Sequence, residues 1–170
     1  MEFLETINLL GAPAGVVVAI IALSVTYRIF KRRKRFDSLV KMIEHFHFEL
    51  AEDRDAIVNI KIKTQSELDE YLNKLKNDPE MTAIHRSIIK VLNFYALTAM
   101  MIKNKHLDKE VVGQYFGGAI RHKIEDWKEL LDYLEKDENY KGMIAEVRYI
   151  YKSLSSLYQF QRSKCKGKVS

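Results

Sequence analysis

Cysteine, proline and glycine are scarce in this 170-residue sequence, which holds one, two and seven of them respectively. The single cysteine, Cys165, excludes an intrachain disulfide framework and a cysteine-rich zinc site. Few prolines and glycines mean few turn signals, which favours long helices over a β-sandwich or barrel. Because 47% of the residues are apolar and 30% are charged, the chain has the composition to build a core.

Recognisable reaction motifs are also missing. The sequence has no phosphate-binding glycine loop, no nucleophile elbow and no HExxH pair. His45 and His47 are two residues apart, roughly 200° around a helix, so they cannot bind one ion from the same face. His45 and Glu49 have a usable spacing, but the rest of a metal site would have to come from elsewhere. The sequence therefore predicts no catalytic residues, no cofactor-binding residues and no metal ligands.

Formal charge is absent from one long stretch, residues 6–27, which reads TINLLGAPAGVVVAIIALSVTY. A helix of this length reaches about 33 Å, enough for a hydrocarbon core of roughly 30 Å. A secretory signal would carry its cations before the apolar run, whereas here Glu2 and Glu5 come before it. The sequence therefore predicts a single N-terminal transmembrane helix, a signal anchor that spans about 7–29 within residues 1–30.

Six cations follow the apolar run directly: Arg28, Lys31, Arg32, Arg33, Lys34 and Arg35. Lysine and arginine stay on the cytoplasmic side during insertion, so we expect the N-terminus outside and the rest of the chain in the cytoplasm. The polybasic juxtamembrane segment, residues 31–36, is expected to bind anionic lipid headgroups, at about 1 kcal/mol per cation. A buried core helix of a soluble protein is the alternative, and a charge cluster fits a membrane boundary better.

The net charge of +5 is concentrated at the two ends of the chain. Residues 36–161 carry 18 basic and 21 acidic side chains, whereas residues 162–170 carry four further cations. We expect residues 163–170 to form a basic disordered tail. Because the basic clusters are not interleaved with stacking aromatics, they predict a lipid surface as the partner and not nucleic acid.

Small residues recur inside the predicted anchor, where Gly11, Gly15 and Ala19 line one helix face. Such a stripe lets two membrane helices approach closely, so it indicates transmembrane packing and a homo-oligomer as an open alternative. Pro13 lies beside the stripe and either starts the helix late or kinks it.

Residues 37–162 are predicted to fold as a bundle of four or five helices. Apolar residues at three- and four-residue spacing indicate a first helix over about 37–62. Thr64 and Glu67 form a capping-box pattern that opens a short helix to about residue 76. Asp78 as N-cap with Pro79 at the first helical position starts the next helix.

The helix predicted over 79–105 is apolar almost all round, which indicates a central position in the bundle. Its Asn93 is then expected to be a buried core polar group that needs hydrogen-bond partners. Asp108 is predicted to cap a helix that continues to Leu134, and a last helix covers about 140–162. The predicted helix after Asp108 contains glycines that we expect to admit a close neighbouring helix: Gly113, Gly117 and Gly118.

The stretch from Val91 to Ile120 resembles an uncharacterised bacterial and phage family of small membrane-anchored, all-helical proteins. The resembling pattern is LNFY at residues 92–95, then Asp108 and Glu110, then the Tyr115–Phe116 pair with Gly117. Members usually have an acidic residue after the first aromatic pair, where this chain has Ala96. The resemblance implies a membrane helix followed by a helical domain, often encoded near prophage or phage-defence genes. It implies no reaction.

These features together predict a membrane-tethered, non-enzymatic helical domain at the cytoplasmic face of a bacterial inner membrane. Its expected partner is an unknown protein, and superinfection exclusion or phage defence is the expected setting. The alternative is a membrane-bound enzyme whose site lies between helices, around Asn93, Tyr95 or His85, without a local motif.

Overall fold

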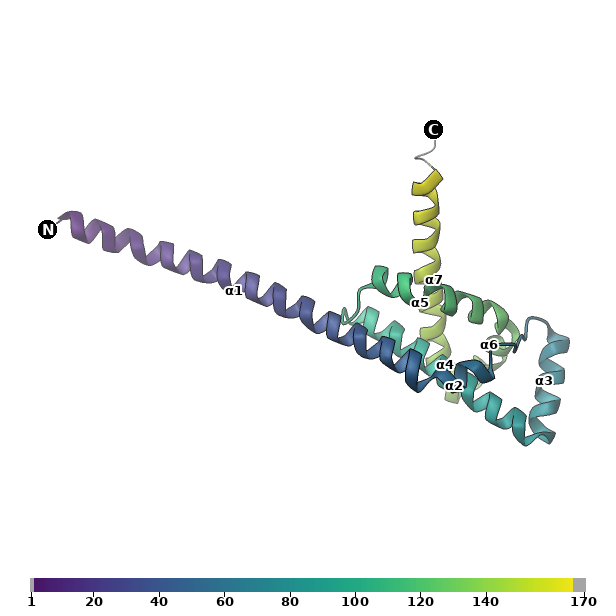
Figure 1. The fold of residues 1–170 in the computed structure, drawn as a ribbon. Helices are drawn as coiled ribbons and strands as arrows, with labels where there is room; N and C mark the ends of the chain where they lie inside the picture. Colours follow the sequence, from purple (N-terminus) through teal and green to yellow (C-terminus); the bar gives the residue numbers. More distant parts are fainter. Residues whose placement is uncertain (1, 167–170) are drawn as a thin grey trace. The chain divides into compact units, whose positions relative to one another are not determined.

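The computed structural model describes residues 2–166, with side chains described over residues 20–156. Regular structure in this part of the chain is entirely helical, so the expected all-α fold class is confirmed (Figure 1). The chain divides into two compact units, residues 1–37 and residues 38–170. The elements are α1 (Glu2–Glu44), the π-helix η1 (His45–Glu49), α2 (Ala51–Ala56), α3 (Gln65–Asn77), α4 (Pro79–Lys103), α5 (Lys109–Asp126), α6 (Lys128–Leu134) and α7 (Glu138–Lys166).

The first unit consists of helix α1 as far as residue 37. Among the described residues, no helix is long and apolar enough to cross a membrane. Side chains of residues 7–19, which make up most of the predicted anchor, lie outside the described ones, as do those of Gly11, Gly15 and Ala19. The large apolar side chains from residue 20 to residue 30 are between 49% and 70% exposed: Ile20, Ile21, Leu23, Val25, Tyr27, Ile29 and Phe30.

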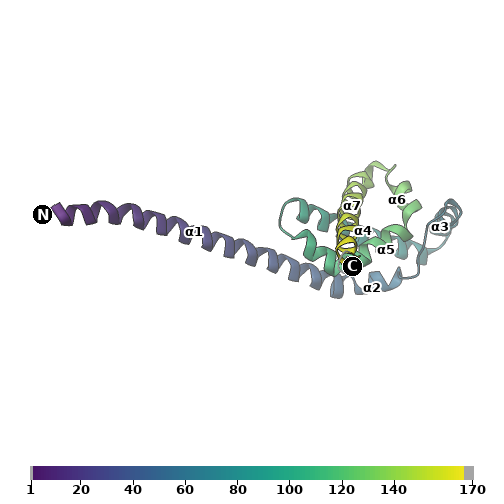
Figure 2. The same cartoon turned by 90° about the horizontal axis from the view of Figure 1, so that it is seen from above.

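The second unit is built around α4, which contacts α2, α3 and α7, while α5 also packs on α7. Figure 2 shows α7 crossing α4. This arrangement confirms the central position that the apolar sequence of α4 predicts. The largest of its nearly or completely inaccessible side chains are Trp127, Tyr95, Phe116, Ile57, Ile62, Ile88, Leu92, Ile120, Leu130, Leu131, Ile144 and Ile150.

Helix starts lie where the local sequence signals place them. Thr64 accepts a hydrogen bond from the backbone N–H of Glu67, whose carboxylate accepts from the Thr64 N–H, a complete capping box for α3. Asp78 caps α4 with Pro79 at its first position, and Asp108 caps α5. All three predicted caps are confirmed.

Two predicted helices are interrupted, so the second unit has more helical segments than the four or five expected. The helix predicted over 37–62 changes to a π-helix at His45 and ends at Ala56. The helix predicted to run to Leu134 breaks at Trp127, between α5 and α6. Residues distant in the sequence contact the chain at both breaks. The local spacing of apolar residues does not reveal such contacts.

The second break is held by the loop after α2. The Trp127 indole N–H donates to the Ile60 carbonyl at 3.0 Å, and Trp127 is fully buried. The backbone of Ile62 bonds both sides of the break, donating to the Asp126 carbonyl at 2.6 Å and accepting from the Glu129 N–H at 3.2 Å. The loop therefore satisfies backbone groups that the helix ends leave unpaired.

The glycines of α5 do not admit a neighbouring helix at Gly117 and Gly118, so that expectation is wrong there. A Cβ added at either position meets no atom within 4 Å.

Glycine in the middle of a helix lacks a side chain and has excess backbone freedom in the unfolded chain. Replacing Gly118 by alanine should therefore raise the free energy of unfolding by about 0.5–1 kcal/mol. Urea denaturation measures this free energy of unfolding. A Gly118→Ala chain that is less stable than the native chain would contradict the finding that space is available for a Cβ at this position.

Helices α3 and α4 are joined by a hydrogen bond between Tyr71 Oη and His85 Nδ1, at 2.7 Å. Burial raises the pKa of Tyr71, so the hydroxyl stays protonated and donates to the neutral imidazole. Burial lowers the pKa of His85 below its ordinary 6.5. In the unfolded chain the same imidazole titrates with its ordinary pKa.

Acid should therefore destabilise the fold through His85. Just below pH 6.5 the unfolded chain binds a proton that the folded chain does not, so stability falls as the pH falls through this window. We expect the free energy of unfolding to decline more steeply between pH 7 and pH 5 in the native chain than in His85→Gln. Denaturant titrations at each pH measure this difference, and parallel curves would contradict it.

Candidate functional site

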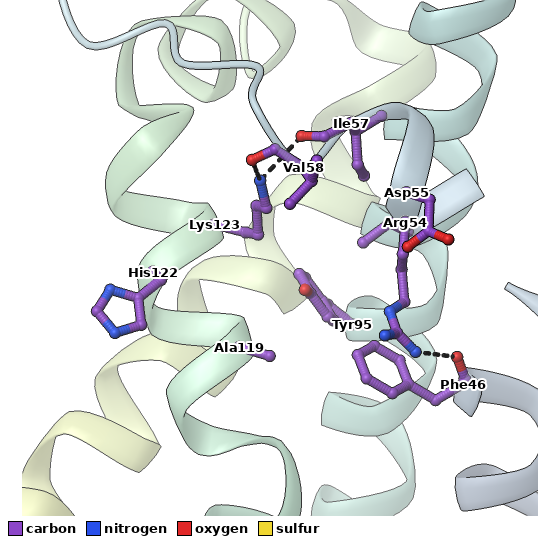
Figure 3. A pocket seen from close by; sticks show the side chains of 10 residues that line it. Phe46, Arg54, Asp55, Ile57, Val58, Tyr95, Ala119, His122 and Lys123 are labelled. Carbon is purple, nitrogen blue, oxygen red and sulfur yellow. Dashed lines mark hydrogen bonds between the residues drawn. The ribbon is translucent and has the colours of Figure 1, made fainter. Parts of the chain in front are cut away.

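A pocket of about 170 Å³ opens in the second unit between η1, α2, α4 and α5 (Figure 3). It combines an apolar floor with a partly exposed, charged rim. Its lining consists of Phe46, Arg54, Asp55, Ile57, Val58, Val91, Tyr95, Ala119, His122 and Lys123.

The π-helix η1 supplies one wall of the pocket. It is closed by a hydrogen bond from the Leu50 N–H to the His45 carbonyl, at 3.0 Å. Phe46 from this turn is buried against Phe94 and Phe116, with ring centroids 5.1 Å away in both cases. π-Helical turns often occur at functional sites, because the extra residue re-aims side chains and carbonyls.

Arg54 is held at the rim by contacts with Phe46. Its Nη1 donates to the Phe46 carbonyl at 2.8 Å, and its guanidinium carbon lies 4.3 Å from the centroid of the Phe46 ring. The carbonyl contact and the cation–π contact fix the plane of the guanidinium. An arginine held this way keeps further N–H donors, since it has five in all.

Lys123 joins α5 to the end of α2 on another side of the pocket. Its Nζ donates to the carbonyls of Ile57 and Val58 at 2.9 and 2.8 Å (Figure 3). A cation at a helix C-terminus also interacts favourably with the helix dipole. Burial lowers the pKa of Lys123, while the nearby Asp126 carboxylate raises it and Lys61 lowers it further.

Tyr95 of α4 lies inside the pocket and is only 1% exposed. Its ring stands between Arg54 and the Lys123 side of the pocket in Figure 3. No hydrogen bond joins its hydroxyl to any residue that the structure describes. Burial raises the pKa of Tyr95, opposed by the charge of Arg54, so the hydroxyl is protonated and able to donate.

A second polar cluster ties α2 to α4 beside the pocket. Asp53 accepts hydrogen bonds from Ser87 Oγ at 2.6 Å and from Lys90 Nζ at 3.0 Å. Burial opposes ionisation of Asp53, but these two hydrogen bonds and the Lys90 charge keep its pKa below the ordinary value. This anchored carboxylate positions α2, and therefore its neighbour Arg54.

Most of the residues singled out in the sequence lie away from the pocket. Asn93 is exposed, so the prediction that it is a buried core polar group is wrong. Thr98 of α4 is a fully buried polar side chain, and its hydroxyl donates to the Phe94 carbonyl. His85 bonds Tyr71, whereas Tyr95 does line the pocket. Of the six predicted lipid-facing cations, Arg28, Lys31, Arg32, Arg33 and Lys34 are exposed and Arg35 is half-buried.

The histidine pairs do not form a metal centre in the described part of the chain. His45 Nδ1 lies 2.6 Å from a Glu49 carboxylate oxygen, the one predicted spacing that brings two such groups together. No group of three or more histidine, cysteine, aspartate or glutamate side chains among the described residues could hold a metal ion.

The architecture is that of an all-helical domain protein with a half-open pocket between helices. The chain belongs to the family described as a domain of unknown function, DUF4760, whose family model matches residues 9–153. This match confirms that the chain is a member of an uncharacterised family. No curated protein and no solved structure matches the chain.

Proposed function

We propose that the protein is a membrane-tethered helical module that binds a partner protein at the cytoplasmic face of a bacterial inner membrane. Residues 7–29 form the anchor, the N-terminus faces outward, and the second unit lies in the cytoplasm. The observation that carries this proposal is the run of exposed apolar side chains from Ile20 to Phe30, followed at once by exposed cations.

Exposed apolar side chains favour a lipid environment for this part of α1. Leu23 is 70% exposed and Phe30 is 65% exposed, and no residue of the described chain covers them. Removing one large apolar side chain from water contributes about 1.5–3 kcal/mol. The family match begins at residue 9 and so covers most of the apolar segment.

The cations after the apolar segment support the orientation. Arg28, Arg32 and Arg33 are exposed on the same helix, where their charges face solvent. Anionic lipids attract such cations by about 1 kcal/mol each and keep them on the cytoplasmic side.

Two exposed apolar side chains of α4 support a protein-binding surface on the second unit. Leu97 and Met100 of α4 are both 49% exposed, at the spacing that places them on one helix face with Asn93. Large exposed apolar side chains grouped on one face are typical of interaction surfaces. The resemblance to bacterial and phage proteins suggests phage defence or superinfection exclusion as the process served.

A phage-restriction assay tests the tethering. Plaque counts should be compared among cells that express the full chain, a chain without residues 1–30, and a chain whose residues 7–29 are replaced by an unrelated apolar span. We expect restriction by the first and third chains and none by the second, with circular dichroism as the check on its folding. Equal restriction by the untethered chain would contradict the proposal.

One observation favours the alternative, a membrane-bound enzyme with a site between helices. The pocket is lined by Tyr95 together with two cations, Arg54 and Lys123. Both cations are engaged with backbone carbonyls, which suits binding and orientation of a ligand. If the native chain converts a bound compound and the Tyr95→Phe chain does not, the protein is an enzyme.

A further inference from the structure

We propose that the pocket lined by Arg54 and Tyr95 binds a small organic anion, a carboxylate on a compact apolar body. Benzoate is the simplest representative. This ligand site goes beyond the proposed tethering function. It does not depend on the anchor, because every lining residue belongs to the second unit.

The size of the pocket limits the ligand to about the bulk of one aromatic ring. Its volume is about 170 Å³. An engineered cavity of about 150 Å³ lined by apolar side chains takes up benzene. Here Phe46, Ile57 and Val91 are buried side chains that offer a similar apolar surface, so the body of the ligand is expected to be hydrocarbon.

The polar groups of the pocket interior are donors. Tyr95 is buried, its hydroxyl is protonated, and no described residue accepts its hydrogen. A hydroxyl that faces a pocket bonds there to water or to an acceptor group of a ligand. An acceptor group on a ligand would satisfy this hydroxyl.

The positive charge of Arg54 favours an anionic group as the acceptor on the ligand. Its guanidinium is fixed on Phe46 by one N–H, and it has further donors. Arginine suits carboxylates because its parallel N–H groups match the two carboxylate oxygens. Arg54 and Tyr95 line the same pocket, and Figure 3 draws their side chains side by side there.

The remaining charged groups leave the site positive. Lys123 adds a second cation beside the carbonyls that it binds. Asp55 is the one acidic side chain of the lining, and it is exposed, so water screens its charge. His122 is exposed, and Figure 3 shows its ring directed away from Tyr95.

Calorimetric titration of the full chain in detergent tests the proposal. Benzoate is the probe, and benzyl alcohol is its uncharged counterpart of similar size. We expect saturable benzoate binding at least roughly tenfold tighter than that of benzyl alcohol, the factor expected from hydrogen bonds to a charged group. Absence of benzoate binding, or equal binding of the two compounds, would overturn the proposal.

Two substitutions place the bound anion in this pocket. Tyr95→Phe removes only the hydroxyl and should weaken benzoate binding roughly tenfold without lowering the unfolding temperature, because the hydroxyl has no partner in the described fold. Ala119→Leu fills the pocket from the exposed side of α5 and should abolish binding. Ala145→Leu, on the exposed face of α7, is the matched control and should bind as the native chain does.

Benzoate binding by the two leucine variants shows whether the anion binds in this pocket. Unchanged benzoate binding by Ala119→Leu would place the anion elsewhere and overturn the proposal. Loss of binding in Ala145→Leu to the same degree as in Ala119→Leu would have the same consequence. Because benzoate binding is measured without phage or lipid, its failure leaves the membrane-tethering proposal standing, and the reverse also holds.

Discussion

Replacing Phe46 with alanine will lower the free energy of unfolding by about 3–5 kcal/mol, whereas replacing Phe48 will change it by less than about 0.5 kcal/mol. The two residues have the same side chain and lie two positions apart in η1. Phe46 is 6% exposed and packs on Phe94 and Phe116, but Phe48 is 78% exposed. The loss at Phe46 combines lost apolar burial with an unfilled cavity and the lost cation–π contact of Arg54.

Urea denaturation of the two variants, followed by circular dichroism, measures this difference. Both substitutions remove the same atoms, so their effects on the unfolded chain are closely matched. Similar losses for the two variants would mean that η1 does not direct Phe46 inward and Phe48 outward.

If residues 7–29 form the proposed anchor, neutralising the juxtamembrane cations will randomise its orientation. Glutamine in place of all four residues 32–35 removes most of the charge that, on this proposal, keeps the second unit on the cytoplasmic side. We expect a substantial fraction of the chains to expose the second unit outside the cell. Protease added to intact spheroplasts, followed by immunoblotting of the second unit, measures that fraction.

The matched control for this experiment carries four glutamines elsewhere. Exposed lysines of the second unit serve this purpose: Lys76, Lys128, Lys136 and Lys152. This control loses the same net charge and should keep the native orientation, since these lysines lie far along the chain from the predicted span. Identical behaviour of the two variants would remove the basis for the proposed orientation.

Helix starts were predictable because their causes are local. A cap depends on residues within four positions of one another, and Thr64 with Glu67 or Asp78 with Pro79 carries the whole signal. The all-helical class follows equally from periodicity and the scarcity of turn residues. Both kinds of evidence are present in short windows of sequence.

Helix interruptions were not predictable because their causes are distant in the chain. Apolar periodicity continues through both His45 and Trp127, so each region reads as one helix. The contacts that go with the breaks come from distant parts of the chain: Phe46 packs on Phe94 and Phe116, and the Ile60 carbonyl accepts from Trp127. Tertiary contacts of this kind override local propensity.

The burial of Asn93 was predicted wrongly although the sequence contains a signal against it. Lys90, Asn93, Leu97 and Met100 follow one another at three- and four-residue spacing, so they share one face of α4. Lys90 and Asn93 mark this face as polar, and the structure exposes all four residues. The mean apolar content of the whole helix does not reveal this exposed face, which is polar at its first half and apolar at its second.

The pocket could not be predicted from the sequence beyond one residue. The sequence makes Tyr95 a candidate for a site between helices, and Tyr95 does line the pocket. Arg54 and Lys123 come from distant helices and carry no motif, so only the fold brings them together. The unpartnered hydroxyl of Tyr95 is likewise a property of packing.

The most direct test of the central claim uses the single native cysteine, Cys165, as a reporter of which side of the membrane holds the second unit. A membrane-impermeant maleimide is added to spheroplasts that express the unmodified chain, before and after permeabilisation. If the apolar N-terminal segment is an anchor with its cations inside, Cys165 reacts only after permeabilisation, and the chain sediments with the membranes. Labelling of Cys165 in intact spheroplasts, or recovery of the chain in the supernatant without detergent, would contradict the account.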